Sequence, residues 1–144
     1  IRSSSKVFNP KTTSPLQKSI LILMHHPDIN IEEKLINDTR IENNAGVILL
    51  KSIINLIKEN PDINMGRIIE NFRDEKRNYN SLEKISRVPI ADYEHPSKEL
   101  HACIYLTIRN HLREKLKDID PSKLKEYSAA QSEIREIEEK SKNF

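Results

Sequence analysis

Apolar residues recur along most of this 144-residue chain at the three- and four-residue spacing that places them on one side of an α-helix. The first such stretch begins at Ser14, which has Gln17 at the spacing of a capping box and Pro15 at the first helical position. Its apolar side is formed by Leu16, Ile20, Leu23 and Met24. These signals predict a helix that begins at Pro15 and ends before Pro27.

Residues 45–59 are apolar on nearly all sides, which predicts the central and most enclosed helix of the fold. Their many β-branched residues would also suit a buried strand. About fifteen residues is long for a strand, however, and the chain offers no second strand to pair with it. Shorter helices are predicted after Asn30, Asn64 and Ser81, and Pro89 ends the last of them.

The longest predicted helix starts at Pro96 and runs to about Asp118. At 1.5 Å per residue it would be roughly 35 Å long, more than a bundle of the preceding short helices needs, so its C-terminal half should project. Asp120 and Pro121 stop this helix and start a final one. The apolar side of the final helix is formed by Leu124, Tyr127, Ala130, Ile134 and Ile137.

The pattern therefore predicts an all-α fold, with a compact bundle of short helices followed by a long helix and a C-terminal helical hairpin. We assign the bundle to residues 14–105 and the hairpin to residues 106–144. Residues 1–13 are basic, rich in serine and threonine, and contain neither an initiator methionine nor an apolar signal segment. We expect them to be a flexible linker from an upstream part of a longer protein.

The string PDIN occurs twice, at Pro27 and at Pro61, with the 34-residue period of tetratricopeptide repeats. Two copies are too few for a solenoid, and the small and aromatic residues of such repeats are missing. The simpler interpretation is that each copy ends one helix with a proline and caps the next with an asparagine, at Asn30 and at Asn64.

Composition narrows the functional classes. A single cysteine excludes an internal disulfide and a thiolate zinc site, and two isolated glycines exclude a glycine-rich phosphate loop. No apolar run approaches the roughly 20 residues that span a bilayer.

The net charge of +2 gives no strong field for binding nucleic acids or membranes. Residues 109–125 hold six basic and three acidic residues, which is a weak nucleic-acid signal without aromatic residues for base stacking.

The last helix is the candidate binding element. A two-helix unit that buries one apolar stripe gains only a few kcal/mol, against an ordering cost of about 1.5 kcal/mol per residue, so we expect that stripe to be available to a partner protein. The expected contact residues are Tyr127, Ala130, Gln131, Ile134, Ile137, Lys140 and Lys142. Two alternatives are that the helix only packs on the bundle, and that a partner binds the bundle around Arg67, Arg73 and Lys76.

The segments SPLQKSILILMHHPDI, NNAGVILLKSIINLIKENPDI, IIENFRDEK, SLEKISR and IADYEHPSKELHACIYLTIRNHLREKL follow one another along the chain. In this order they resemble the C-terminal, helicase-binding domain of bacterial replicative DNA primase, over nearly the whole chain after the linker. The resemblance implies a helical bundle and hairpin that bind the N-terminal region of the hexameric replicative helicase. Such binding recruits RNA primer synthesis to the replication fork and modulates both enzymes.

The resemblance also implies that the catalytic parts of the protein lie outside this fragment. The full-length family protein is a DNA-directed RNA polymerase, a nucleotidyltransferase whose zinc-binding module and magnesium-dependent core lie upstream. We therefore expect this fragment to be non-catalytic, free of cofactors, monomeric alone, weak or inactive in nucleic-acid binding, and located in the bacterial cytoplasm. The bundle also resembles the N-terminal domain of the helicase itself, which is one alternative. A small helical nucleic-acid-binding module is the other.

Overall fold

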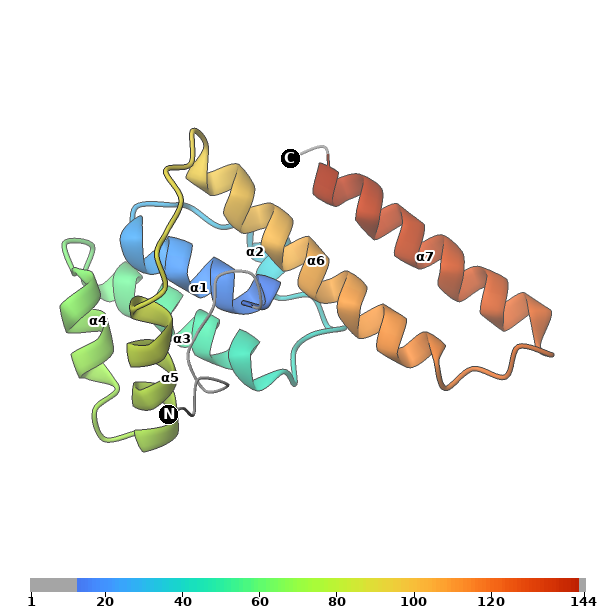
Figure 1. Cartoon of the computed structure of the whole chain (residues 1–144), viewed down its shortest axis with the longest axis horizontal. Helices are drawn as coiled ribbons and strands as arrows, with labels where there is room; N and C mark the ends of the chain where they lie inside the picture. Colours follow the sequence, from blue (N-terminus) through green and yellow to red (C-terminus); the bar gives the residue numbers. More distant parts are fainter. Residues whose placement is uncertain (1–12, 143–144) are drawn as a thin grey trace, which may run out of the picture.

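The computed structural model describes residues 13–142, which form seven helices and no strand (Figure 1). The predicted all-α class is confirmed. The predicted linker lies outside the described residues except for Thr13. The helices are α1 (Pro15–His25), α2 (Glu33–Ile36), α3 (Ala45–Glu59), α4 (Met65–Asn71), α5 (Lys76–Ser86), α6 (Pro96–Leu116) and α7 (Leu124–Lys142).

Local capping signals set the starts of three helices. At α1 the predicted capping box forms, because the Ser14 hydroxyl accepts from the Gln17 backbone N–H and the Gln17 side chain accepts from the Ser14 N–H, both at 3.1 Å. The side chains of Asn44 and Asn64 accept from backbone N–H groups in the first turns of α3 and α4. These contacts satisfy amide groups that have no partner within the helix.

The two PDIN segments do not form the same cap. Asn64 caps α4, but α2 begins at Glu33 with no side-chain cap, so the prediction for Asn30 is wrong. The reason is tertiary: Ile31 is buried in the core, and the Glu32 backbone N–H donates to a side chain of α6. These contacts keep residues 30–32 outside the helix.

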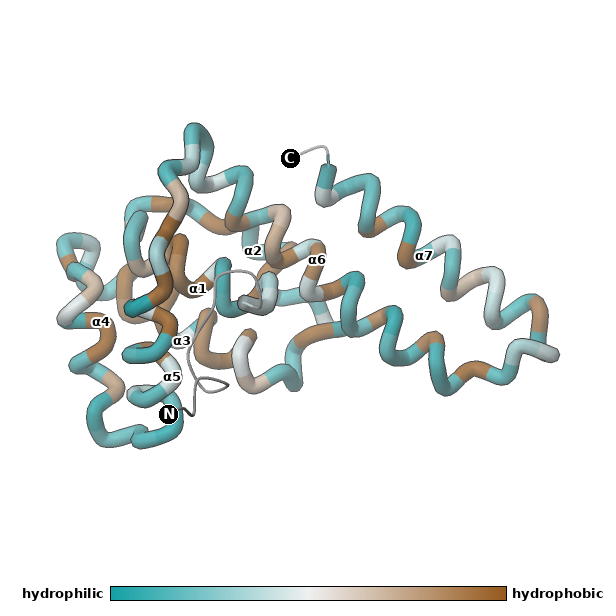
Figure 2. The backbone as a smooth tube through the Cα atoms, viewed as in Figure 1, coloured by the Kyte–Doolittle hydropathy of each residue, from teal (hydrophilic) through white to brown (hydrophobic). Residues whose placement is uncertain are grey.

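Helix α1, rather than α3, is the most enclosed helix. Residues 20–24 are each at most 3% exposed, and α1 contacts α3, α4, α5 and α6. In α3, Ile48 is 52% exposed, and Ile54 and Leu56 are only partly buried. The prediction that residues 45–59 form the central helix is wrong because an apolar sequence is enclosed only where neighbouring helices cover it. Figure 2 shows the apolar residues concentrated among the helices of the bundle.

His101 joins α6 to the segment before α2 inside the core. It is 3% exposed, and its Nδ1 lies 2.7 Å from the Ser97 carbonyl oxygen, so Nδ1–H is the donor. Its Nε2 accepts from the Glu32 backbone N–H at 3.3 Å. These two bonds select the neutral Nδ1–H tautomer. Cys103, two residues further along α6, is also buried, and burial raises the pKa of its thiol to about 11.

Helices α6 and α7 lie side by side and antiparallel, and they form the hairpin (Figure 1). Ile137 of α7 belongs to the same buried cluster as Ile104 and Ile108 of α6, so the core continues from the bundle into the hairpin. The last turns of α6, the loop after it and the first half of α7 extend beyond the bundle (Figure 1). We call residues 109–135, which include this part and the turns that lead into it from the bundle, the distal hairpin.

Replacing His101 by alanine should lower the free energy of unfolding by about 2 to 3 kcal/mol, because it removes a buried side chain from the core together with its bonds to the Glu32 N–H and the Ser97 carbonyl. His111 of the same helix is partly exposed and is the matched control. His111→Ala should change the unfolding free energy by less than about 0.5 kcal/mol. Urea unfolding followed by circular dichroism measures both, and equal effects would contradict the assigned role of His101.

Candidate docking site

The seven residues predicted to contact a partner lie on α7, but the structure places them in different environments. Ile134 and Ile137 are only 7% and 2% exposed. The half-buried residues are Tyr127, Ala130 and Gln131, and the exposed ones are Lys140 and Lys142. The two isoleucines that were expected to supply much of the apolar contact are therefore inside the protein.

The expectation of a largely uncovered apolar stripe is wrong at Ile134 and Ile137. It treated the hairpin as a two-helix unit that must stabilise itself. Instead, Ile137 packs into the core shared with the bundle, and ion pairs hold α7 to α6 and to the loop before α3. The stability of α7 thus comes from the whole core, and the C-terminal half of α7 leaves little apolar surface for another protein.

Arg40, in the loop between α2 and α3, connects the bundle to α7. Its guanidinium donates to both carboxylate oxygens of Asp38, at 2.9 and 2.7 Å, and lies 3.3 Å from the Glu133 carboxylate. The hydrogen bonds from Arg40 outweigh burial and lower the pKa of Asp38. This fork of two bonds fixes Arg40 in the orientation that reaches Glu133.

A second set of charges connects α6 to α7 at the edge of the distal hairpin. Glu138 accepts from Arg113 at 2.8 Å and lies 3.9 Å from Arg109. One carboxylate therefore faces two guanidinium groups. Burial, together with the nearby charge of Arg113, lowers the pKa of Arg109.

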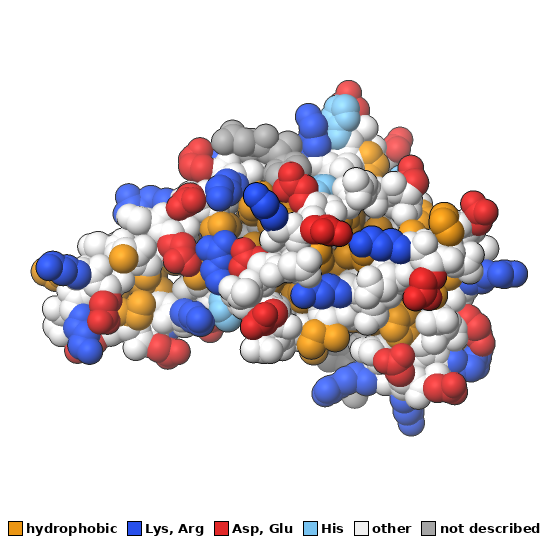
Figure 3. Space-filling model, turned by 180° about the vertical axis from the view of Figure 1, so that it is seen from behind, with side chains coloured by type: hydrophobic (Ala, Val, Ile, Leu, Met, Phe, Trp, Pro, Cys, Tyr) orange, Lys and Arg blue, Asp and Glu red, His pale blue; other side chains and the backbone are white. Residues whose placement is uncertain are grey.

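The distal hairpin keeps apolar side chains within reach of solvent. Leu124, at the start of α7, is 73% exposed, and Leu116, Ile119 and Tyr127 of the same part of the chain are partly exposed. Figure 3, in which the distal hairpin points to the left, shows apolar side chains there between charged ones. Within the described part of the hairpin, exposed and partly exposed apolar side chains therefore lie at this end rather than along the C-terminal half of α7.

Between the two helices of the distal hairpin lies a hollow of about 280 Å³. It is lined by Arg113, Leu116, Gln131, Ile134 and Arg135. Of these five, Gln131 and Ile134 are partner-contact residues predicted from the sequence, and the other three were not predicted as such. Leu116 belongs to the four-residue apolar repeat of α6, and Arg135 follows Gln131 by four residues, yet only the antiparallel pairing brings these positions together.

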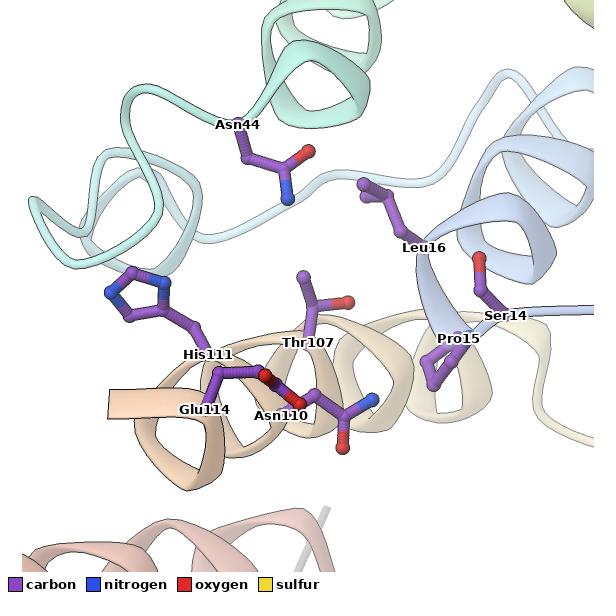
Figure 4. Close-up of a pocket in the computed structure, with 8 residues that line it drawn as sticks. All are labelled: Ser14, Pro15, Leu16, Asn44, Thr107, Asn110, His111 and Glu114. Carbon is purple, nitrogen blue, oxygen red and sulfur yellow. The ribbon is translucent and has the colours of Figure 1, made fainter. Parts of the chain in front are cut away.

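A larger hollow of about 340 Å³ lies between the start of α1, the start of α3 and α6 (Figure 4). Most of its polar side chains already have structural partners. Ser14 and Asn44 cap α1 and α3, and Thr107 donates to the Cys103 carbonyl. Asn44 and His111 also line an adjoining hollow of about 410 Å³. We interpret these hollows as a seam between packed elements.

The alternative surface around Arg67, Arg73 and Lys76 comprises α4, the turn after it and the start of α5. Arg73 is bonded to both carboxylate oxygens of Glu70 and lies 5.3 Å from the centre of the Tyr79 ring. Its charge is therefore already paired within the bundle.

Within residues 13–142, no helix is long and apolar enough to cross a membrane, and no three His, Cys, Asp or Glu side chains gather as metal ligands. In comparisons with known proteins, no family model, curated protein or solved structure matches the chain. Its function is therefore inferred from its residues and their geometry.

Ile137→Ala should lower the free energy of unfolding by about 2 to 4 kcal/mol, because it opens a cavity in the shared core. Lys142→Ala, an exposed substitution on the same helix, should change it by less than about 0.5 kcal/mol. Chemical denaturation measures both. A cost below about 0.5 kcal/mol for Ile137→Ala would mean that α7 is not packed on the core in solution.

Asp38→Asn should cost about 1 to 2 kcal/mol of stability at pH 7 through loss of the charged hydrogen bonds to Arg40. Because the folded protein lowers the pKa of Asp38, its contribution is present above the unfolded pKa of about 3.9 and is lost as the pH falls through the lower folded value. The stability difference between wild type and variant should therefore shrink below about pH 4. Urea unfolding at pH 7 and pH 3 tests this, and a constant difference would contradict it.

Proposed function

We propose that this chain is a protein-docking domain that binds its partner through the distal hairpin. The observation that carries this proposal is Leu124, which is 73% exposed at the start of α7. Tyr127, one turn further along α7, and Leu116, at the end of α6, are partly exposed, and the other end of the hairpin is fixed in the core. Covering this surface stabilises a complex by roughly 25 cal/mol per Å² of apolar area removed from water. A hairpin that is already ordered loses little conformational entropy on binding.

We further propose that the partner is the N-terminal region of a hexameric bacterial replicative helicase. The resemblance of nearly the whole chain after the linker to the helicase-binding domain of bacterial DNA primase, carried by the segments quoted above, supports this choice. The arrangement of a helical bundle followed by a hairpin agrees with the one that the resemblance implies. In this role the chain would recruit RNA primer synthesis to the replication fork and modulate the helicase, and catalysis would belong to upstream parts of the protein.

The proposed contact surface differs from the one expected from the sequence. Tyr127, Ala130 and Gln131 remain in it, because they are half-buried in the distal part of α7. Leu116 and Leu124 take the place of Ile137, and Ile134, which is 7% exposed, contributes only through the hollow that it lines between α6 and α7. Lys140 and Lys142 lie at the opposite end of α7, where Lys142 lies beside the start of α6. They would therefore form a rim only for a partner that spans the whole hairpin.

Leu124→Ser should weaken binding to the helicase N-terminal domain by about 1 to 2 kcal/mol, a factor of roughly 5 to 30 in Kd. Ile48→Ser is the matched control, because Ile48 is also an exposed aliphatic residue but lies on α3 of the bundle. It should leave Kd unchanged. Isothermal titration calorimetry with the full chain measures both variants.

The other outcomes discriminate between the remaining functions. Undetectable binding of the wild-type chain would reject the helicase as partner. A greater loss for Ile48→Ser than for Leu124→Ser would place the docking surface on the bundle. Binding to single-stranded DNA that falls steeply with salt, without binding to the helicase domain, would favour the nucleic-acid-binding module.

A further inference from the structure

The hollow in the distal hairpin combines an apolar floor with a basic edge. Leu116 of α6 and Ile134 of α7 supply the apolar lining, and Arg113 and Arg135 supply the charge. Its volume of about 280 Å³ is just below the roughly 300–1,000 Å³ of pockets for small-molecule ligands. It therefore suits a protruding side chain of a partner protein better than a separate ligand.

The charges around this hollow are not balanced. Glu138 is shared by Arg109 and Arg113, and within the described part of the chain Arg135 makes no ion pair and is exposed. Both charged side chains among the lining residues of the hollow, Arg113 and Arg135, are thus arginines. Burial is the main cause of the lowered pKa of Arg109, and the positive charge of Arg113 lowers it further, so positive charge gathers at this edge of the hollow. A carboxylate from another molecule would offset that charge.

The lining also distinguishes among anionic partners. Its apolar residues are aliphatic, and the side chains around the hollow include no aromatic ring on which a nucleic-acid base could stack. An arginine presents two parallel N–H groups that match a carboxylate, and a neighbouring apolar contact that excludes water strengthens such a pair. This combination fits an acidic protein segment.

We propose that the hollow is the anchor point for an acidic amphipathic segment of the partner. One apolar side chain of that segment packs on Leu116 and Ile134, and an adjacent Asp or Glu pairs with Arg135 and Arg113. Gln131, at the edge of the hollow, is placed to bond the backbone of the same segment. This inference rests on the proposed function, because it specifies which feature of the helicase N-terminal domain the hairpin recognises.

The experiment is a binding titration of the full chain with the helicase N-terminal domain at 50 and 200 mM salt, by surface plasmon resonance. Arg135→Glu reverses a charge at the hollow, whereas Arg67→Glu makes the same change on α4 and is the matched control. Arg135→Glu should slow association about tenfold or more at the lower salt concentration and weaken its salt dependence. Arg67→Glu should remain within about twofold of wild type.

Leu116→Ala tests the apolar half of the anchor. It should speed dissociation about fivefold or more, since loss of a packed anchor acts mainly on the off-rate. Circular dichroism confirms that each variant is folded before its binding is compared. As a rescue, acid-to-lysine substitutions in the helicase domain should include one that restores association with the Arg135→Glu chain.

The outcomes separate the two proposals. If wild type does not bind the helicase domain, the proposed function is rejected and this inference with it. If wild type binds but Arg135→Glu and Leu116→Ala bind equally well, the anchor is rejected while the function stands. If Arg67→Glu loses as much as Arg135→Glu, binding follows net charge and the anchor is again rejected. Arg135-dependent binding of single-stranded DNA, in place of the helicase domain, would overturn both.

Discussion

The fold depends on enclosing five consecutive apolar residues of α1. Successive helical residues point about 100° apart, so residues 20–24 face every direction around the helix axis. All five are nevertheless almost completely buried, which requires neighbours on each side. Helices α3, α4, α5 and α6 supply those neighbours. Because α6 is much longer than the bundle it helps to close, its last turns continue outward and create the base of the hairpin.

The hairpin is anchored at one end and free at the other. Near the bundle, Ile137 packs into the core and Arg40 reaches Glu133 on α7, so this end of α7 has both apolar and ionic support. Further out, beyond the described helices of the bundle, α6 and α7 lie beside each other (Figure 1). The two ends therefore have different roles. The anchored end fixes the direction of the hairpin, and the side chains of the outer end stay accessible to solvent.

Helix caps that involve neighbouring residues could be predicted from the sequence, whereas the packing of one helix against another could not. The capping box of Ser14 and Gln17 and the cap at Asn64 follow from neighbouring residues alone, and both predictions are confirmed. The failed cap at Asn30 and the enclosure of α1 instead of α3 depend on which helices cover which face. In the candidate site, the burial of Ile134 and Ile137 and the position of Arg135 beside Arg113 depend on the register of two antiparallel helices. Periodicity within a single helix contains no information about that register.

Chemical modification of Cys103, the one cysteine of the chain, can report the opening of the core around α6. Cys103 is 3% exposed, and its thiol has a pKa of about 11, so at neutral pH it holds almost no reactive thiolate while α6 stays packed. A maleimide would consequently modify the native chain only when local opening separates α6 from its neighbours. The alkylation rate would therefore report how often such opening occurs. A second cysteine introduced at an exposed position of the hairpin would react far sooner, so a dye could be attached there selectively without removing the native thiol.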